Sequence, residues 1–179
     1  MSTYGLLMAA PALGLLLWAA AEDTRSRRIP NWLTFSLVLS GIGQSFAGGG
    51  TTTPAMSLMG FIVGLALPLV LFLLGALGGG DVKLLAGVGA WFGPAAALSV
   101  FTVAAIVGAV IVVTQALLQG RTRVLMRNTA VVAINLAHVQ DVGLEHTKAT
   151  GQSCKSVDRP LPYAVVVLIA MVIVMAASM

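Results

Sequence analysis

The sequence predicts an all-α integral membrane protein, a bundle of about six transmembrane helices that forms one domain over residues 1–179. Three observations predict this fold class. The chain is 58% hydrophobic and only 9% charged, with a mean hydropathy of +0.98, values outside the range of soluble domains of this size. Its apolar residues form long runs separated by short polar or glycine-rich breaks. The ten Lys and Arg residues all lie in alternate breaks, as the positive-inside rule requires.

The first apolar run, residues 4–21, is interpreted as a retained span with its N-terminus outside the cytoplasm. No positive charge precedes the run, whereas Arg25, Arg27 and Arg28 follow it. A secretory signal peptide has the opposite order of charge, with its basic residues before the apolar run. We therefore expect this segment to stay in the membrane.

Breaks along the chain define the other spans. Pro30 bends the chain and suits the first turn of the helix that follows. Residues 48–54 form a turn rich in Gly and Thr, a glycine triplet occupies residues 78–80, and Gly93 and Pro94 turn the chain again. The expected spans are residues 4–21, 32–47, 55–77, 82–92, 95–118 and 161–178.

Charge then predicts the topology. With the N-terminus outside, the breaks after the first, third and fifth spans face the cytoplasm, and they hold all ten basic residues. The outer turns at residues 48–54 and 93–94 hold none. Both termini are therefore expected outside the cytoplasm.

Two further patterns concern how the helices pack. Residues 124–139 are amphipathic, which predicts either a helix along the cytoplasmic interface or a partly inserted connector. Gly60 with Gly64, and Gly75 with Gly79, have the spacing of small-residue faces on which membrane helices approach closely.

The sequence contains few residues suited to metal or disulfide chemistry. The single Cys154 excludes a disulfide within one chain and a multi-cysteine zinc site. His138 and His146 lack a convincing ligand set, so we expect neither a metal nor another cofactor. The basic residues are explained by topology, so a net charge of +4 does not predict a nucleic-acid partner.

Two carboxylates are the strongest candidates for chemistry. The chain has six acidic residues, and Asp23 and Asp81 both lie where apolar segments end on the predicted cytoplasmic side. Ionisable groups at the edge of the membrane are costly and are often functional. If helix packing brings them together, two carboxylates can activate a water molecule and polarise a peptide carbonyl.

The same residues also have purely structural interpretations. Asp81 follows glycine and precedes an apolar helix, which also fits a helix N-cap. Asp23 can balance Arg25 or Arg27 at the interface, and the glycine triplet can simply end the third span. Lys83 can pair with Asp81 or extend its ammonium group toward lipid phosphates, and we expect the second.

Two motifs give the chain a family resemblance. Asp23-x-Arg25-x-x-x-Ile29-Pro30-Asn31, followed by Gly78-x-Gly80-Asp81-x-Lys83, resembles the type IV prepilin peptidases of the GxGD class of membrane aspartyl proteases. The segment Leu161-Pro162-Tyr163 also looks like the closing motif of that family. The resemblance extends over essentially the whole chain.

This resemblance implies an endopeptidase at the cytoplasmic face of the inner membrane. Its partners would be membrane lipid and a prepilin, whose short basic leader is cut off after a glycine, just before an apolar helix. Asp23 and Asp81 match the two catalytic aspartates of the family. The supporting motif positions are Arg25, Pro30, Asn31, Gly78, Gly80 and Lys83. Without a cytoplasmic insert or paired cysteines, the chain is most similar to the minimal peptidases of tight-adherence (Flp) pili, so N-methylation is not expected.

Two other functions are alternatives to a prepilin peptidase. A small proton-coupled transporter would use Asp81 and Lys83, but it would also need charge at mid-depth within the spans. A non-catalytic membrane assembly factor would have no need for both aspartates. Substrate turnover in aspartate-to-asparagine variants separates the three hypotheses.

Overall fold

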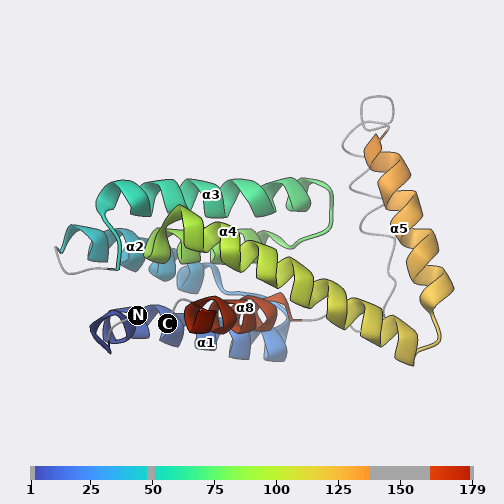
Figure 1. Cartoon of the computed structure of the whole chain (residues 1–179), viewed down its shortest axis with the longest axis horizontal. Coiled ribbons are helices and arrows are strands. Elements are labelled where there is room, and N and C mark those ends of the chain that lie inside the picture. Colours follow the sequence, from blue (N-terminus) through green and yellow to red (C-terminus); the bar gives the residue numbers. More distant parts are fainter. Residues whose placement is uncertain (1–2, 48–50, 138–161, 178–179) are drawn as a thin grey trace.

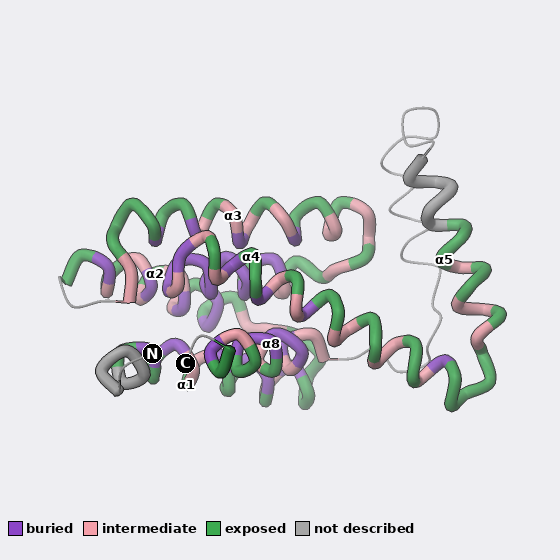
Figure 2. The backbone as a smooth tube through the Cα atoms, viewed as in Figure 1, coloured by how far each residue is buried: buried purple, intermediate pink, exposed green. Residues whose placement is uncertain are grey.

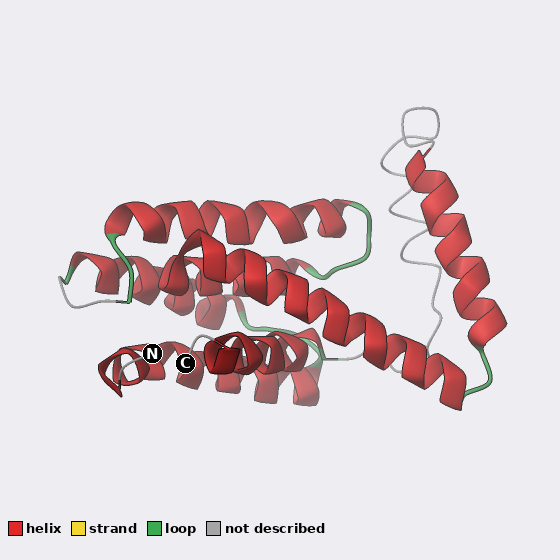
Figure 3. Cartoon of the chain, in the orientation of Figure 1, coloured by secondary structure: helices red, strands yellow, loops and turns green. Residues whose placement is uncertain are grey.

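The structure is a computed structural model that describes residues 3–47, 51–137 and 162–177. These residues form helices joined by short loops, with no strand among them, so the all-helical prediction is confirmed (Figure 3). The helices are α1 (Thr3–Ser26), α2 (Asn31–Phe46), α3 (Pro54–Leu73), α4 (Gly79–Leu118), α5 (Thr122–Ala137) and α8 (Tyr163–Ala177). The predictions made for His138, His146, Cys154 and Leu161 lie outside the described residues.

Helix α4 consists of two helices that meet at a sharp turn. Gly93 has φ 83° and ψ 178°, a conformation that residues with a Cβ rarely adopt, and Pro94 follows it. The Cβ of Ala97 lies 3.3 Å from the position that a Cβ would take on Gly89. Residues eight apart in a straight helix are separated by about 12 Å, so the chain folds back at Gly93. The predicted turn at Gly93 and Pro94 is confirmed.

The first part of α4, residues 79–92, is the centre of the bundle. It packs against α2 and α3, and α8 contacts both α1 and α4 (Figure 1). Leu33 and Leu37 of α2 and Leu84 and Val88 of α4 are fully buried in the hydrophobic core. The indole of Trp91 is also buried there, and it donates a hydrogen bond to the carbonyl of Leu37 at 2.9 Å. This arrangement fixes the start of α4 against its neighbours.

Close approach between α3 and α4 depends on glycine. A Cβ on Gly60 would clash with the carbonyl oxygen of Gly89, and a Cβ on Gly64 would clash with that of Leu85. The predicted small-residue face at Gly60 and Gly64 is therefore confirmed. The outer side of α3 is instead covered by exposed apolar residues, among them Leu58 and Ile62 (Figure 2).

The predicted Gly75–Gly79 face is wrong, because α3 ends before it. The amide of Ala76 donates to the carbonyl of Leu71 at 2.9 Å, and that of Gly75 donates to Phe72 at 3.0 Å. With Gly75 at φ 76°, this is a Schellman motif, which ends the helix at Leu73 rather than at residue 77. Gly79 belongs to α4, which begins three residues before the expected start at residue 82.

Two of these helices are long and apolar enough to cross a membrane, Pro54–Leu73 and Gly79–Leu118, while Tyr163–Ala177 is apolar but shorter. The count of six spans and their orientation remain predictions. A helix was predicted at residues 124–139, and α5 is present at Thr122–Ala137, where it projects away from the bundle (Figure 1). Its position at the membrane interface also remains a prediction.

Candidate active site

Asp23 lies in the last turn of α1 and is held by the start of α8. Its side chain is only 7% exposed, and its Oδ2 accepts a hydrogen bond from the amide of Ala164 at 3.0 Å. This amide is among the first donors of α8, which have no partner within their own helix. This hydrogen bond joins residues that are 141 positions apart in the sequence, and it fixes the position of the Asp23 carboxylate.

The backbone after Asp23 ends α1 with an unusual conformation. Arg27 has φ 55° and donates its amide to the carbonyl of Asp23 at 3.0 Å. This is the αL form of a helix end, a place usually taken by glycine. Among the described residues other than glycine, only Arg27 has a positive φ. The turn directs residues 27–29 toward the start of α4.

Asp81 lies at the third position of α4, and Gly78 is the N-cap. Its Oδ2 accepts a hydrogen bond from the amide of Gly78 at 3.1 Å. The interpretation of Asp81 as a plain N-cap is therefore wrong by three positions, although the carboxylate does satisfy a backbone donor at the helix start.

Gly80 lets the loop after α1 pack on the start of α4. A Cβ on Gly80 would lie 3.2 Å from the Cβ of Ile29, closer than side chains normally approach. A Cβ on Gly79 would meet only the ring of Phe72, at an ordinary 3.6 Å. The glycines therefore begin the helix and also keep the segment that follows Asp23 near Asp81.

The two aspartates line one cavity of about 440 Å³. Within it the two side chains are close enough to interact electrostatically. The other lining residues are Arg27, Arg28, Ile29, Asn31, Gly78, Gly79, Gly80 and Tyr163. Helices α1, α4 and α8 and the loop before α2 therefore all contribute to a single polar cavity.

The remaining predicted site residues have different positions. Pro30 is the N-cap of α2, with φ −61°, and Arg25 is exposed and does not line the cavity. The ammonium group of Lys83 donates to Oδ1 of Asn31 at 2.9 Å, which joins α4 to α2. The expected contact of Lys83 with lipid phosphates stays a prediction, since its exposed ammonium group has donors besides the one given to Asn31.

Sequence reasoning did not single out Arg27, Arg28, Ile29, Gly79 or Tyr163 as site residues. Tyr163 is the first residue of α8, and its phenol interacts electrostatically with the carboxylate of Asp81. The one available signal for it was the motif at the start of the last span. No sequence pattern indicated that Arg27 and Arg28 line the cavity, because the positive-inside rule already explains basic residues at this position.

The family comparison covers the segment that holds both aspartates. The model of the type IV leader peptidase family matches residues 11–113. The chain belongs to this family. A search of curated proteins and a search of solved structures found no match.

Membership makes this chain a peptidase of a membrane-embedded family. The matched segment contains Asp23, Asp81 and the glycines between α3 and α4, but it ends before α8. The position of Tyr163 in the cavity lining and the hydrogen bond from Ala164 to Asp23 are therefore observations on this leader peptidase's own structure.

Gly80 provides a test of how the cavity is assembled. We expect Gly80→Val to lower the rate of peptide cleavage by about 100-fold, because the larger side chain displaces Ile29 and shifts the loop relative to Asp81. Gly79→Val is the matched control, since a Cβ there meets only the ring of Phe72, at an ordinary distance of 3.6 Å, and its loss of rate should be several-fold smaller. Cleavage rates in detergent measure both variants. Equal losses would show that the packing of Ile29 does not set the geometry.

Proposed function

We propose that this leader peptidase is an aspartyl endopeptidase that removes the leader of prepilins, of type IV or Flp type, for pilus assembly or secretion. The observation that carries the proposal is the single cavity shared by Asp23 of α1 and Asp81 of α4. Family membership supplies the reaction class, and the paired carboxylates supply its chemistry.

The mechanism uses the two carboxylates as one acid–base unit. It requires one carboxylate to be ionised while the other holds a proton. The ionised carboxylate takes a proton from a water molecule while the other donates its proton to the scissile carbonyl oxygen. The tetrahedral intermediate then collapses: the first carboxylate gives the proton that it took from water to the peptide nitrogen, which leaves as an amine, and the former carbonyl oxygen returns its proton to the second carboxylate. The products are a leader with a new C-terminal carboxylate and a mature chain with a new N-terminal amine.

The ends of the helices are a suitable place for this reaction. Asp23 is near the end of α1, and Asp81 and Tyr163 are near the starts of α4 and α8, so the cavity lies at one end of the bundle. A substrate must unwind for its peptide bond to be attacked, and unwinding costs less near water than in the bilayer core. The cavity can therefore accept an extended peptide whose neighbouring residues stay in the membrane.

The distribution of basic residues supports a cytoplasmic orientation in the inner membrane. Arg27 and Arg28 line the cavity, and Lys83 is two residues after Asp81, which also lines it. Under the positive-inside rule these residues support a cytoplasmic position for this end of the bundle. Six spans with both termini outside are consistent with this orientation.

The test is cleavage of a co-expressed Flp-type prepilin in membranes that contain the chain. We expect a single cut after a glycine, detected as a gel shift and assigned by mass spectrometry. Failure to cut a panel of Flp-type and type IV prepilins, by a chain that is inserted and folded, would contradict the proposal.

Tyr163 provides a further prediction for the same site. Its phenol lines the cavity and interacts with Asp81, so it can donate a hydrogen bond to the scissile carbonyl oxygen while partial negative charge develops there in the transition state. We expect Tyr163→Phe to lower kcat by about 10- to 100-fold with little change in KM, because that bond forms only in the transition state. Steady-state kinetics on a purified prepilin measure both constants. Loss confined to KM would instead make Tyr163 a substrate-binding residue.

A further inference from the structure

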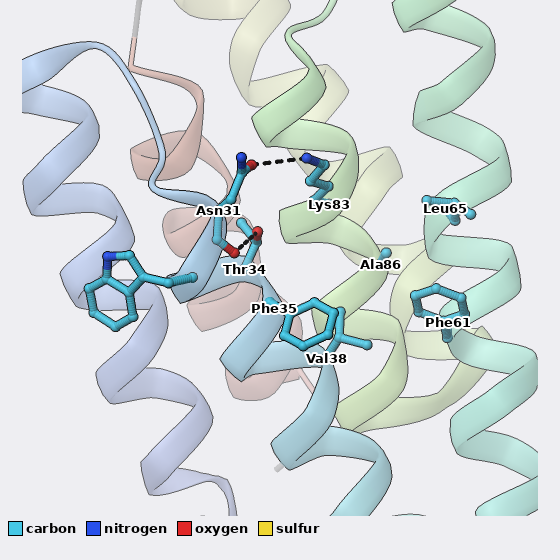
Figure 4. Close-up of a pocket in the computed structure, with 9 residues that line it drawn as sticks. Asn31, Thr34, Phe35, Val38, Phe61, Leu65, Lys83 and Ala86 are labelled. Atoms are coloured by element: carbon cyan, nitrogen blue, oxygen red, sulfur yellow. Dashed lines mark hydrogen bonds between the residues drawn. The ribbon is translucent and has the colours of Figure 1, made fainter.

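A second cavity of about 440 Å³ lies beside the one that holds the aspartates. Phe35 and Val38 of α2 form one wall, Phe61 and Leu65 of α3 form the other, and Ala86 of α4 lies between them (Figure 4). We call this cavity the apolar groove.

Polar groups occur at one end of the apolar groove. Asn31 and Lys83 lie there, joined by their hydrogen bond of 2.9 Å (Figure 4). Thr34 also lines the groove, but its hydroxyl donates to the carbonyl of Asn31 at 3.0 Å. The length of the groove away from this end therefore offers apolar contact rather than hydrogen bonds.

The polar end of the apolar groove adjoins the candidate active site. Asn31 lines both cavities, and Lys83 is two residues after Asp81 on the same helix. Phe35, on the α2 wall, is 65% exposed, so the groove is open at its surface. A peptide held between the aspartates thus has a direct path past Asn31 into an open apolar channel.

We propose that the apolar groove binds the hydrophobic segment that follows the scissile bond of the substrate, with the Asn31–Lys83 pair at the junction. This inference rests on the proposed function and specifies where the membrane part of the substrate docks. Where a substrate helix unwinds, its backbone loses internal hydrogen bonds, and the amide of Asn31 and the ammonium of Lys83 can replace some of them. The apolar walls then receive the side chains of the segment that stays helical.

A lipid acyl chain is the other occupant that apolar walls would accept. The headgroup of such a lipid would offer phosphate and ester oxygens to Lys83 and Asn31, so the polar end suits both occupants. The position of that end beside the aspartates favours a peptide, because Asn31 lines both cavities.

Photo-crosslinking in an inactive chain tests this inference without requiring cleavage. In full-length Asp81→Asn, benzoylphenylalanine replaces Phe61 or Val38, which line the groove. Their sequence neighbours Ile62 and Leu39 are 56% and 55% exposed and do not line it, so they are matched controls. The probe is a synthetic peptide with a basic leader, a glycine and an apolar segment of about 20 residues.

We expect adducts at residues 61 and 38 to exceed those at 62 and 39 by about 10-fold, and mass spectrometry should locate them in the apolar segment. Equal yields at all four positions, adducts in the leader, or adducts with lipid alone would overturn the inference.

A second measurement uses the active chain. Val38→Trp and Leu65→Trp fill the apolar groove, whereas Leu39→Trp and Ile62→Trp add the same bulk outside it. We expect the first pair to raise KM for the full peptide by about 10-fold and the second pair to leave it unchanged.

The two measurements distinguish failure of the groove inference from failure of the proposed function. If the wild type cuts no prepilin, the proposed function fails, while crosslinking still shows whether the peptide binds in the groove. If the wild type cuts and neither measurement separates groove from control, the groove inference fails alone.

Discussion

Asp23→Asn and Asp81→Asn should each lower the rate of prepilin cleavage by about 1,000-fold or more. In the proposed mechanism each carboxylate performs a proton transfer that an amide cannot perform, and such transfers contribute about 100- to 10,000-fold in rate. The replaced side chains keep their shape, and an asparagine oxygen can still accept from the amide of Ala164 or of Gly78. The fold should therefore survive. The measurement is the initial rate of leader release, followed by mass spectrometry.

Glu22→Gln is the matched control for this experiment. Glu22 is adjacent to Asp23 on α1 and does not line the cavity, so its loss should change the rate by less than about 3-fold. Thermal unfolding in detergent shows whether each variant remains folded. A rate within about 10-fold of wild type in a folded Asp23→Asn or Asp81→Asn chain would make that aspartate structural.

Gly60→Ala and Gly89→Ala should each lower the unfolding temperature by about 10 °C, or prevent folding. Each added methyl group would clash with the carbonyl oxygen of the other glycine, and backbone cannot move aside as a side chain can. Relief requires α3 and α4 to separate, which costs about 3 kcal/mol or more. In a chain of this size that corresponds to roughly 6–12 °C.

Gly43→Ala is the control, because a Cβ on Gly43 of α2 meets nothing within 4 Å. Alanine favours a helix over glycine by about 1 kcal/mol, so this variant should unfold at or slightly above the wild-type temperature. Thermal unfolding in one detergent, followed by helical circular dichroism, compares the three variants. If all three unfold at the wild-type temperature, the backbones of α3 and α4 do not touch at these glycines.

The helices could be predicted from sequence because apolar runs and glycine or proline breaks are local signals. Gly93 and Pro94 marked a true reversal of the chain, and Gly60 and Gly64 marked a close contact. The end of α3 was missed because its Schellman motif depends on how Gly75 folds back on Leu71, and a run of apolar residues continues beyond it.

The site was only partly predictable. Topology was enough to place Asp23 and Asp81 at one end of the bundle, and the structure shows that they line one cavity. The contact between Asp23 and Ala164 joins opposite ends of the sequence, and no local pattern indicates it. The bond from Lys83 to Asn31 was missed for the same reason, since it depends on how α4 packs against α2.

The central claim is that both aspartates act together on one peptide bond, and a transition-state mimic tests it most directly. The ligand is a leader-junction peptide whose scissile bond is replaced by a hydroxyethylene group, and its partner has a plain ethylene group there. We predict that wild type binds the hydroxyl form at least about 100-fold more tightly, and that either Asp23→Asn or Asp81→Asn removes this preference. A preference that survives in either variant would contradict the claim that the two carboxylates act together on the same peptide bond.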